Sequence, residues 1–187
     1  MENIVIIRAE LKDAKAISDI TEYWVMKGKV EEKDKGYLRE KGIYNEGEII
    51  NLINYSLVTV AKYEGEVVSF YLINNVYHLD LIEERKKLIQ DKINNKILPL
   101  GRYAYSLLAS TDERFLGKGL NTQTLNLLKE IAKDEYDYFI GIMGYDNLAT
   151  QKSSLKMGWK HFCDVGNGLL AVIGTTEERN DRLITNI

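Results

Sequence analysis

The chain has 187 residues, 45% of them hydrophobic, and its 25 basic and 28 acidic side chains give a net charge of −3 at pH 7. This composition is typical of a soluble globular protein, and we expect a single domain over residues 1–187 with a polar tail at 174–187. No basic run indicates a nucleic-acid partner, no apolar run reaches the ~20 residues that span a bilayer, and the first residues lack a signal-peptide pattern. We therefore expect a cytoplasmic protein that binds neither nucleic acid nor membrane.

Cysteine and histidine are scarce in this chain. The single cysteine, Cys163, excludes an internal disulfide, and one cysteine with two histidines leaves little for a zinc site. We interpret Cys163 as a buried apolar residue rather than a nucleophile, because His161 is the one histidine near it in the sequence. We predict that the protein holds no metal.

The first part of the chain predicts a strand followed by two helices. Residues 3–8 form an apolar, β-branched run, and apolar residues recur at helical spacing over 11–20 and again over 46–55. The polar segment 27–47 between them is interpreted as solvated surface. A segment of this kind can also close over a substrate, so that alternative stays open.

Two β-rich runs follow, and a helix separates them from the next strand. The runs 56–63 and 66–73 are joined by a Glu-Gly dipeptide, which predicts a hairpin. Residues 80–96 place isoleucines at helical spacing between charges, so we expect an amphipathic helix that ends before Pro99. We expect it to cover the sheet, with lining of a pocket and a dimer contact as the alternatives.

The stretch 109–132 combines an apolar strand, a glycine turn and a helix. The first N–H groups of a helix lack intrahelical partners and lie at the positive end of its dipole, so they bind anions. Gly117 and Gly119 lack Cβ atoms, which allows unusual backbone angles and a close approach of a phosphate to the amides of 116–120. The apolar face of the helix is expected at Leu120, Leu127, Leu128 and Ile131.

Two common nucleotide motifs do not fit this turn. The dinucleotide fingerprint needs a third glycine where Thr122 stands, and the Walker motif needs serine or threonine where Gly119 follows Lys118. The pattern Arg114-x-x-Gly117-x-Gly119, with positive charge from Arg114 and Lys118, instead resembles the acyl-CoA pyrophosphate motif of the GNAT N-acetyltransferase superfamily.

A second feature of that family follows further along the chain. Asn147 stands eleven residues before the pair Gly158-Trp159, which is similar to the closing helix pattern of the family. The predicted elements of this half are strands at 102–110, 136–143, 161–165 and 168–173, and a helix at 147–157. The resemblance implies an α/β fold with a mixed, mostly antiparallel central sheet, in which a splayed parallel strand pair is flanked by helices.

The resemblance also implies roles for particular residues. The turn would hold the pyrophosphate of CoA beside Arg114, the end of the fourth strand would pair with the pantetheine arm, and Asn147 would lie beside that arm. The residues concerned are Leu108, Ala109 and Ser110 on the strand and Phe115, Leu116, Gly117, Lys118, Gly119 and Leu120 in the turn. Asn147 fits equally well as the N-cap of its helix.

The catalytic groups depart from the family pattern. The tyrosine that usually protonates the departing thiolate is replaced by Ser154, whose hydroxyl is shorter and much less acidic than a phenol with a pKa of about 10. Ser154 acting through water, Tyr145 reaching in, and slow or absent transfer remain as alternatives. The fourth strand holds no carboxylate for a base, so the nearby candidates are Tyr103, Tyr105, His78 and Asp112, and of these we predict Tyr105 as a catalytic residue.

From the resemblance we expect an N-acetyltransferase that moves an acetyl group from acetyl-CoA, its co-substrate, to a primary amine by direct attack in a ternary complex. The amine is a small molecule or a peptide, and its identity stays open. The alternative is a non-catalytic or weakly catalytic acyl-CoA-binding sensor or scaffold domain. A homodimer is compatible with either hypothesis.

Overall fold

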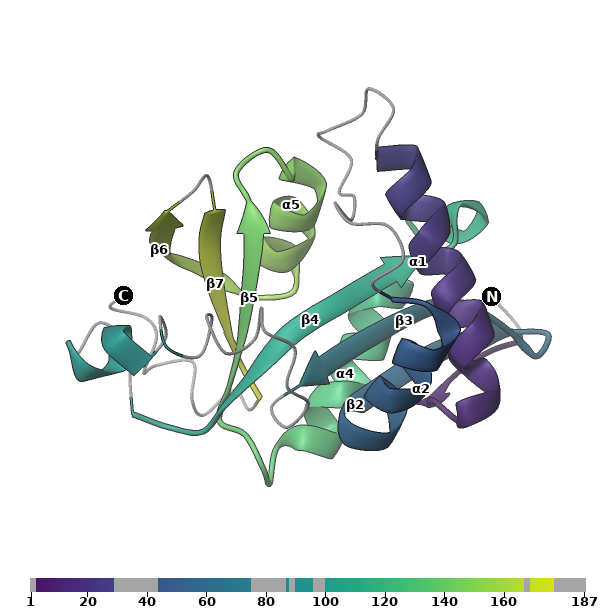
Figure 1. Ribbon diagram of the computed structural model, residues 1–187, viewed down its shortest axis with the longest axis horizontal. Helices are drawn as coiled ribbons and strands as arrows, with labels where there is room; N and C mark the ends of the chain where they lie inside the picture. The colour runs from purple at the N-terminus through teal and green to yellow at the C-terminus, as the bar shows by residue number, and fades with distance from the viewer. Residues whose placement is uncertain are drawn as a thin grey trace.

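The structure is a computed structural model that describes residues 3–28, 44–74, 87, 90–95, 100–166 and 169–176. The described elements include both strands and helices, interspersed along the chain (Figure 1). Their bounds are β1 Ile4–Arg8, η1 Leu11–Asp13, α1 Ala14–Gly28, α2 Glu46–Tyr55, β2 Leu57–Tyr63, β3 Glu66–Asn74, β4 Tyr103–Thr111, η3 Glu113–Phe115, α4 Leu120–Ala132, β5 Tyr138–Gly144, α5 Leu148–Lys156, β6 Lys160–Gly166 and β7 Leu169–Thr175.

The described strands form one seven-stranded sheet in the order β1-β2-β3-β4-β5-β7-β6. Neighbouring strands are antiparallel except for β4 and β5, which are parallel. A parallel pair needs a crossover, and α4 supplies it. The expected mixed, mostly antiparallel sheet with one parallel pair is confirmed, as are the hairpin of β2 and β3 and the closing pair β6 and β7.

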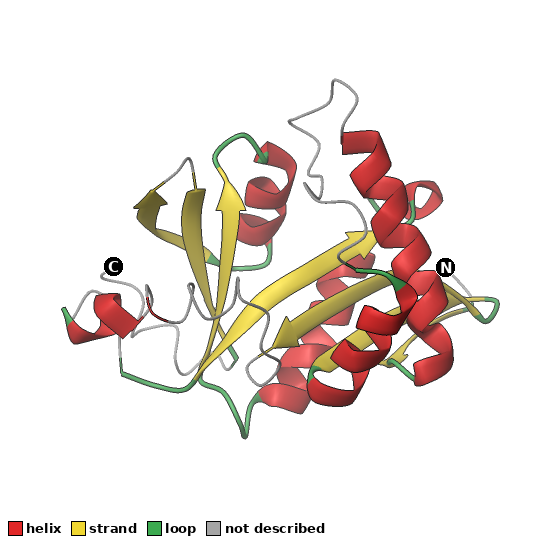
Figure 2. Cartoon of the chain, in the orientation of Figure 1, coloured by secondary structure: helices red, strands yellow, loops and turns green. Residues whose placement is uncertain are grey.

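Helices α1 and α2 cover one face of the sheet, and α4 covers the other. Figure 2 shows α1 and α2 in front of the strands and α4 behind them. On the first face, Ile17 of α1 and Ile49 of α2 are fully buried against Val60, Phe70 and Leu108 of the sheet. These apolar side chains make the larger core and hold the first four strands together.

The buried face of α4 differs in part from the face expected from the sequence. Leu120, Thr124, Leu125, Leu128 and Ala132 are buried, and Thr59 of β2 donates a hydrogen bond to the Thr124 carbonyl at 2.8 Å. Leu127 and Ile131 are only partly buried. The prediction was wrong for these two residues, because the register against β2 and β3 centres the contact on Leu125 and Thr124, and apolar spacing alone does not reveal that register.

Trp159 packs on the α4 face of the sheet against two glycines. Its indole is 2% exposed and lies over Gly141 of β5 and Gly174 of β7. A Cβ built on Gly174 would come within 3.0 Å of Trp159 Cε2 and Nε1, and one on Gly141 within 3.2 Å of Cζ3. Both positions therefore favour glycine, since a side chain there would displace the indole.

Several expectations fall on residues outside the described ranges. Within the segment 80–96, Lys87 and residues 90–94 are helical and residue 95 is a turn, and the other residues of that segment, together with His78, lie outside the described residues. Most of the polar segment 27–47 and of the tail from 174 also lies outside them. None of the described helices is long and apolar enough to cross a membrane.

Candidate functional site

The parallel strands β4 and β5 separate partway along their length. Their pairing runs from Tyr103 opposite Tyr138 to Ser106 opposite Gly141 and stops there. Beyond that point β4 pairs with β3, and β5 pairs with β7, so the two strands diverge (Figure 1). We call the space between residues 107–111 of β4 and the end of β5 the opening, and the Ser106–Gly141 pair its apex.

A β-bulge begins the divergence. The register between β3 and β4 shifts between Leu72, which faces Leu108, and Ile73, which faces Ser106, so Leu107 is the extra residue. Leu107 and Leu108 both pack against the core under α1 and α2. A bulge bends its strand and increases its twist, which explains why β4 leaves β5 directly after the apex.

One edge of β4 faces the opening. The Ser110 carbonyl accepts from Ser69 Oγ of β3 at 3.1 Å, and the Asp112 amide donates to the Val68 carbonyl at 2.8 Å, so both groups face β3. Backbone groups alternate along an antiparallel strand, which turns those of Ala109 and Thr111 toward the opening. Of the three strand residues that we expected to pair with an extended ligand, Ala109 alone turns its main-chain groups toward the opening. The main-chain groups of Leu108 and Ser110 face β3.

Trp24 contacts the end of this edge that is farther from the apex. Its indole nitrogen donates to the Thr111 carbonyl at 2.8 Å, and Tyr23, the preceding residue of α1, donates from its hydroxyl to the Glu113 carboxylate. The two rings meet edge to face, with centroids 5.4 Å apart. Helix α1 is thereby fastened to the loop that leads from β4 into the glycine turn.

The glycine turn has the backbone geometry that the sequence predicted. Gly117 and Gly119 have φ values of +74° and +71°, in the left-handed region, and Gly119 is the N-cap of α4. A Cβ built on either glycine meets no atom within 4 Å among the described residues. The two positions need glycine because of φ rather than crowding, and they leave open space in front of the turn.

Six consecutive amides point out of the hydrogen-bonding network at this turn. In the part of the chain that the structure describes, the N–H groups of residues 117–122 donate no hydrogen bond, whereas Phe115 N donates to Asp112 O and Leu116 N to Glu113 O. The available donors thus begin at Gly117 and extend into the helix, beyond the expected range 115–120. Such a row of amides at a helix N-terminus is an anion site.

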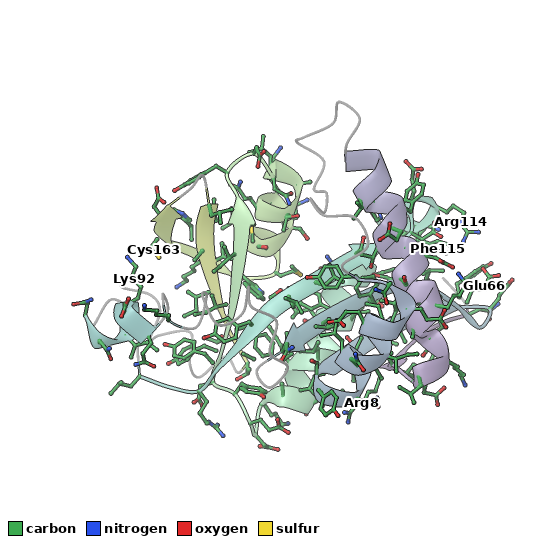
Figure 3. The ribbon with its side chains drawn as sticks, in the orientation of Figure 1. Arg8, Glu66, Lys92, Arg114, Phe115 and Cys163 are labelled. Atoms are coloured by element: carbon green, nitrogen blue, oxygen red, sulfur yellow. The ribbon has the colours of Figure 1, made fainter. Side chains whose placement is uncertain are left out.

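The two cations of the motif are held by neighbouring groups. The Arg114 guanidinium donates to both oxygens of Asp112, with Nη2 at 2.8 Å. Its Nη2 also lies 3.9 Å from the carboxylate of Glu66, and Figure 3 labels Arg114 and Glu66. Lys118 Nζ lies 4.5 Å from the centre of the Phe115 ring. The Arg114 bond keeps the pKa of Asp112 below its ordinary value. Arg114 therefore bonds Asp112 at the start of the turn, whereas the sequence predicted it only as a cofactor-binding residue.

Asn147 is the N-cap of α5, one of the two roles considered for it. Its Oδ1 accepts from the Thr150 amide at 3.2 Å. The amide group of an asparagine has two further donors, so the cap does not prevent a contact with a ligand.

The three predicted catalytic side chains do not form one group. Tyr105 is 5% exposed and packs with Tyr103 and Tyr138 on the face that carries Leu107. Ser154 is 4% exposed on α5. Tyr145 is 44% exposed beyond β5, and desolvation together with a hydrogen bond and charge from Asp164 of β6 raises its pKa.

The structure also disfavours two of the side chains that were candidates for the general base. Asp112 is bound to Arg114 by side chain and by the Arg114 amide, so its oxygens are already used. Burial raises the pKa of Tyr103, which keeps that phenol protonated. Cys163, on the edge strand β6, is partly exposed rather than buried as expected, and burial still raises the pKa of its thiol.

A pair of hydroxyl groups at the apex was not predicted as a site. Tyr71 OH of β3 lies 2.9 Å from Ser106 Oγ of β4. Tyr71 is 4% exposed, and its burial raises the pKa of the phenol to about 12. Nothing in the sequence pairs two residues that are 35 positions apart.

No protein-family model and no curated protein sequence matches the chain, and its similarity to known proteins lies in the fold. The PaiA N-acetyltransferase of Thermoplasma acidophilum, solved in complex with coenzyme A, superposes with a TM-score of 0.68 at 13% identity over 92% of this chain and 99% of that one. YncA of Salmonella typhimurium, solved with acetyl-CoA, gives 0.60 at 14% over 95% and 96%. A mosquito arylalkylamine N-acetyltransferase-like protein gives 0.64 at 11% over 92% and 100%.

The chain therefore has the GNAT fold of these acetyltransferases, as the resemblance implied.

Proposed function

We propose that the protein is an acetyl-CoA-dependent N-acetyltransferase that acts on a primary amine. One observation carries the proposal: the open edge of β4 leads from the apex to the row of amides at residues 117–122. An extended ligand with an anionic end fits such a path, because the edge can pair with its amides and the turn can bind its phosphates. Neighbours of the same fold were solved with coenzyme A or acetyl-CoA.

The residues present fit this co-substrate. The open space before Gly117 and Gly119 admits a pyrophosphate, and Ala109 offers main-chain groups to the pantetheine arm. The length of the open edge of β4 also suits an extended pantetheine arm, because the four residue steps from Thr111 to Leu107 span about 13 Å at ~3.3 Å per residue. Asn147 lies one turn of chain beyond β5 and would flank the arm from the other side.

The chemistry we propose is direct attack of the amine on the thioester. When bound, acetyl-CoA supplies the activated acetyl group. The protein orients the two reactants, and a main-chain N–H of β4 beside the opening donates to the carbonyl oxygen as negative charge develops there. Direct transfer needs no protein nucleophile, and Cys163 on the edge strand β6 is not part of the opening.

The class of acceptor is also a proposal. A neighbour of the same fold is named for arylalkylamines, which are small primary amines, and we extend that class to this chain. A peptide amine is the alternative within the same reaction. Fold alone does not choose between them.

A second function is favoured by the state of Ser154. A buried serine in place of the usual phenol suits a domain that binds acyl-CoA as a sensor or scaffold and transfers slowly or not at all. Thiol release separates the two functions: an enzyme given acetyl-CoA and a panel of arylalkylamines, polyamines and peptides releases CoA faster than without amine, and a binding domain does not.

The binding site itself is tested by calorimetric titration of acetyl-CoA into matched glycine variants. Gly119→Asn places a side chain in the space before the turn, and asparagine tolerates the left-handed region better than most residues. Gly65→Asn is the control, because Gly65 also has a positive φ of +88° and open space around it, in the β2–β3 turn. We expect similar stability of the two variants and at least a tenfold weaker binding for Gly119→Asn alone. Equal binding by both would refute the site.

A further inference from the structure

We propose that Ser106 is a catalytic residue whose hydroxyl donates a hydrogen bond to the departing thiolate of CoA, and that Tyr71 positions that hydroxyl. This inference rests on the proposed function. It assigns the donor role to a residue that lies outside both the glycine motif and the closing helix pattern. It replaces the phenol that Ser154 does not supply.

The position of Ser106 carries the first step of the argument. It is the last residue of β4 that pairs with β5, opposite Gly141, so the open edge ends beside it. A ligand held at the glycine turn and extended along that edge brings its far end, the thioester, to the apex. Gly141 lies under the Trp159 indole, and Ser106 is partly exposed at the apex.

The partner of Ser106 carries the second step. Tyr71 OH lies 2.9 Å from Ser106 Oγ, and Tyr71 is 4% exposed. When the phenol donates to Ser106 Oγ, the serine proton is left to point elsewhere, and the opening is the exposed direction. Burial raises the pKa of Tyr71 to about 12, so the phenol keeps its proton at any pH near neutrality and has that proton to donate to Ser106 Oγ.

The other hydroxyl candidates are placed less well. Tyr105 packs with Tyr103 and Tyr138 on the face that carries Leu107. Tyr145 is bonded to Asp164 of β6 and lies beyond the end of β5. Tyr71, by contrast, packs with Ala109 and Trp159 on the α4 face, which is the face of the glycine turn.

The acetyl transfer requires no proton to leave a protein side chain. The amine nitrogen forms a bond to the acetyl carbon, the C–S bond breaks, and its electron pair stays on sulfur. The Ser106 proton remains on oxygen and shares a hydrogen bond with that sulfur, while the extra proton on the new amide nitrogen passes to solvent. A thiol has a pKa of about 8.5, so its anion leaves readily with such help. One well-placed donor is worth about 10²-fold in rate.

The test measures the thiol of bound CoA directly and needs no acceptor. CoA carrying ¹³C beside its sulfur is bound to the native protein, and its thiol pKa is read from the carbon shift as the pH is raised. We expect a lower thiol pKa than in free CoA, which rises toward the free value in Ser106→Ala and in Tyr71→Phe and is restored in Ser106→Thr. Tyr138→Phe is the control, because Tyr138 is equally buried but lies on the other face.

The outcomes separate this inference from the proposed function. CoA binding with a thiol pKa that is unchanged in Ser106→Ala overturns the role of Ser106 and leaves the proposed site intact. Native protein that fails to bind CoA refutes both. Where an amine acceptor is found, Ser106→Ala and Tyr71→Phe should lower kcat about 10-fold to 100-fold with little change in the KM for acetyl-CoA. An equal fall in Tyr138→Phe would show a merely structural effect and overturn the inference.

Discussion

The Trp24 indole nitrogen donates a hydrogen bond to the Thr111 main-chain carbonyl across 2.8 Å, and so ties the second half of α1 to the last residue of β4. Thr111 ends the edge that faces the opening, and the glycine turn begins six residues later. Helix α1 therefore determines where the open edge stops. The bond links α1 on one face of the sheet to the loop that leads into the glycine turn before α4.

Breaking this bond should destabilise the protein more than breaking its exposed neighbour. Trp24 is 8% exposed, so Trp24→Phe leaves a smaller ring in a packed site and a carbonyl without its donor. We expect a loss of about 1–2 kcal/mol in the free energy of unfolding, measured with urea. Tyr23→Phe removes the exposed bond to Glu113 and should cost less than about 0.5 kcal/mol. Equal losses would contradict this account of α1.

The seat of Trp159 predicts a coupled pair of substitutions. Gly174→Ala brings a Cβ to 3.0 Å from Trp159 Nε1 and Cε2, so the indole must move. We expect a loss of about 1–3 kcal/mol in thermal or urea unfolding. In Trp159→Phe the five-membered ring that meets this Cβ is gone, so the two changes together should cost less than their sum. Strict additivity would show that the indole is not what Gly174 accommodates.

The Arg114–Asp112 pair predicts a specific acid response. Side-chain hydrogen bonds from Arg114 lower the pKa of Asp112 in the folded protein. A carboxyl of this kind stabilises the fold at pH values above its unfolded pKa of about 3.9, and this contribution is lost as the pH falls through the lower folded pKa.

Asp112→Asn should therefore flatten the decline of stability in acid. Below about pH 5, we expect the free energy of unfolding to fall less steeply in the variant than in the native protein. Arg114→Gln should flatten it as well, because the remaining carboxyl regains an ordinary pKa. Urea unfolding at a series of pH values measures this effect, and variants with the slope of the native protein would exclude the pair as its source.

The hydroxyl groups first considered from the sequence should matter little for transfer. Ser154 is buried on α5, and Tyr145 is bonded to Asp164 of β6, so we expect Ser106 rather than either of these groups to meet the thiolate. We expect Ser154→Ala and Tyr145→Phe to keep thiol release within about 3-fold of the native rate, well below the 10²-fold or more that loss of a general acid typically costs. A much larger fall in Ser154→Ala would restore the serine, acting through water, as the acid.

Local sequence was sufficient for the parts of the site that depend on neighbouring residues. The spacing of Gly117 and Gly119 predicted a turn with unusual backbone angles before a helix, and both residues have positive φ, which residues without Cβ adopt at least cost. The N-cap of α5 was one of the two roles considered for Asn147, and its Oδ1 caps the Thr150 amide. The parallel pair followed from the strand-helix-strand succession at the centre of the chain.

The tertiary structure alone decided what happens between distant segments. The bulge at Leu107 depends on how β4 registers against β3 while two adjacent leucines pack under α1 and α2, and no pattern within β4 shows that balance. The same holds for the bond between Tyr71 and Ser106, which are 35 residues apart, and for the use of Arg114 as a brace for Asp112. The sequence by itself determined where a glycine turn precedes a helix, because backbone angles are local, and the tertiary structure determined which side chains meet at the apex, because strand register and packing are not.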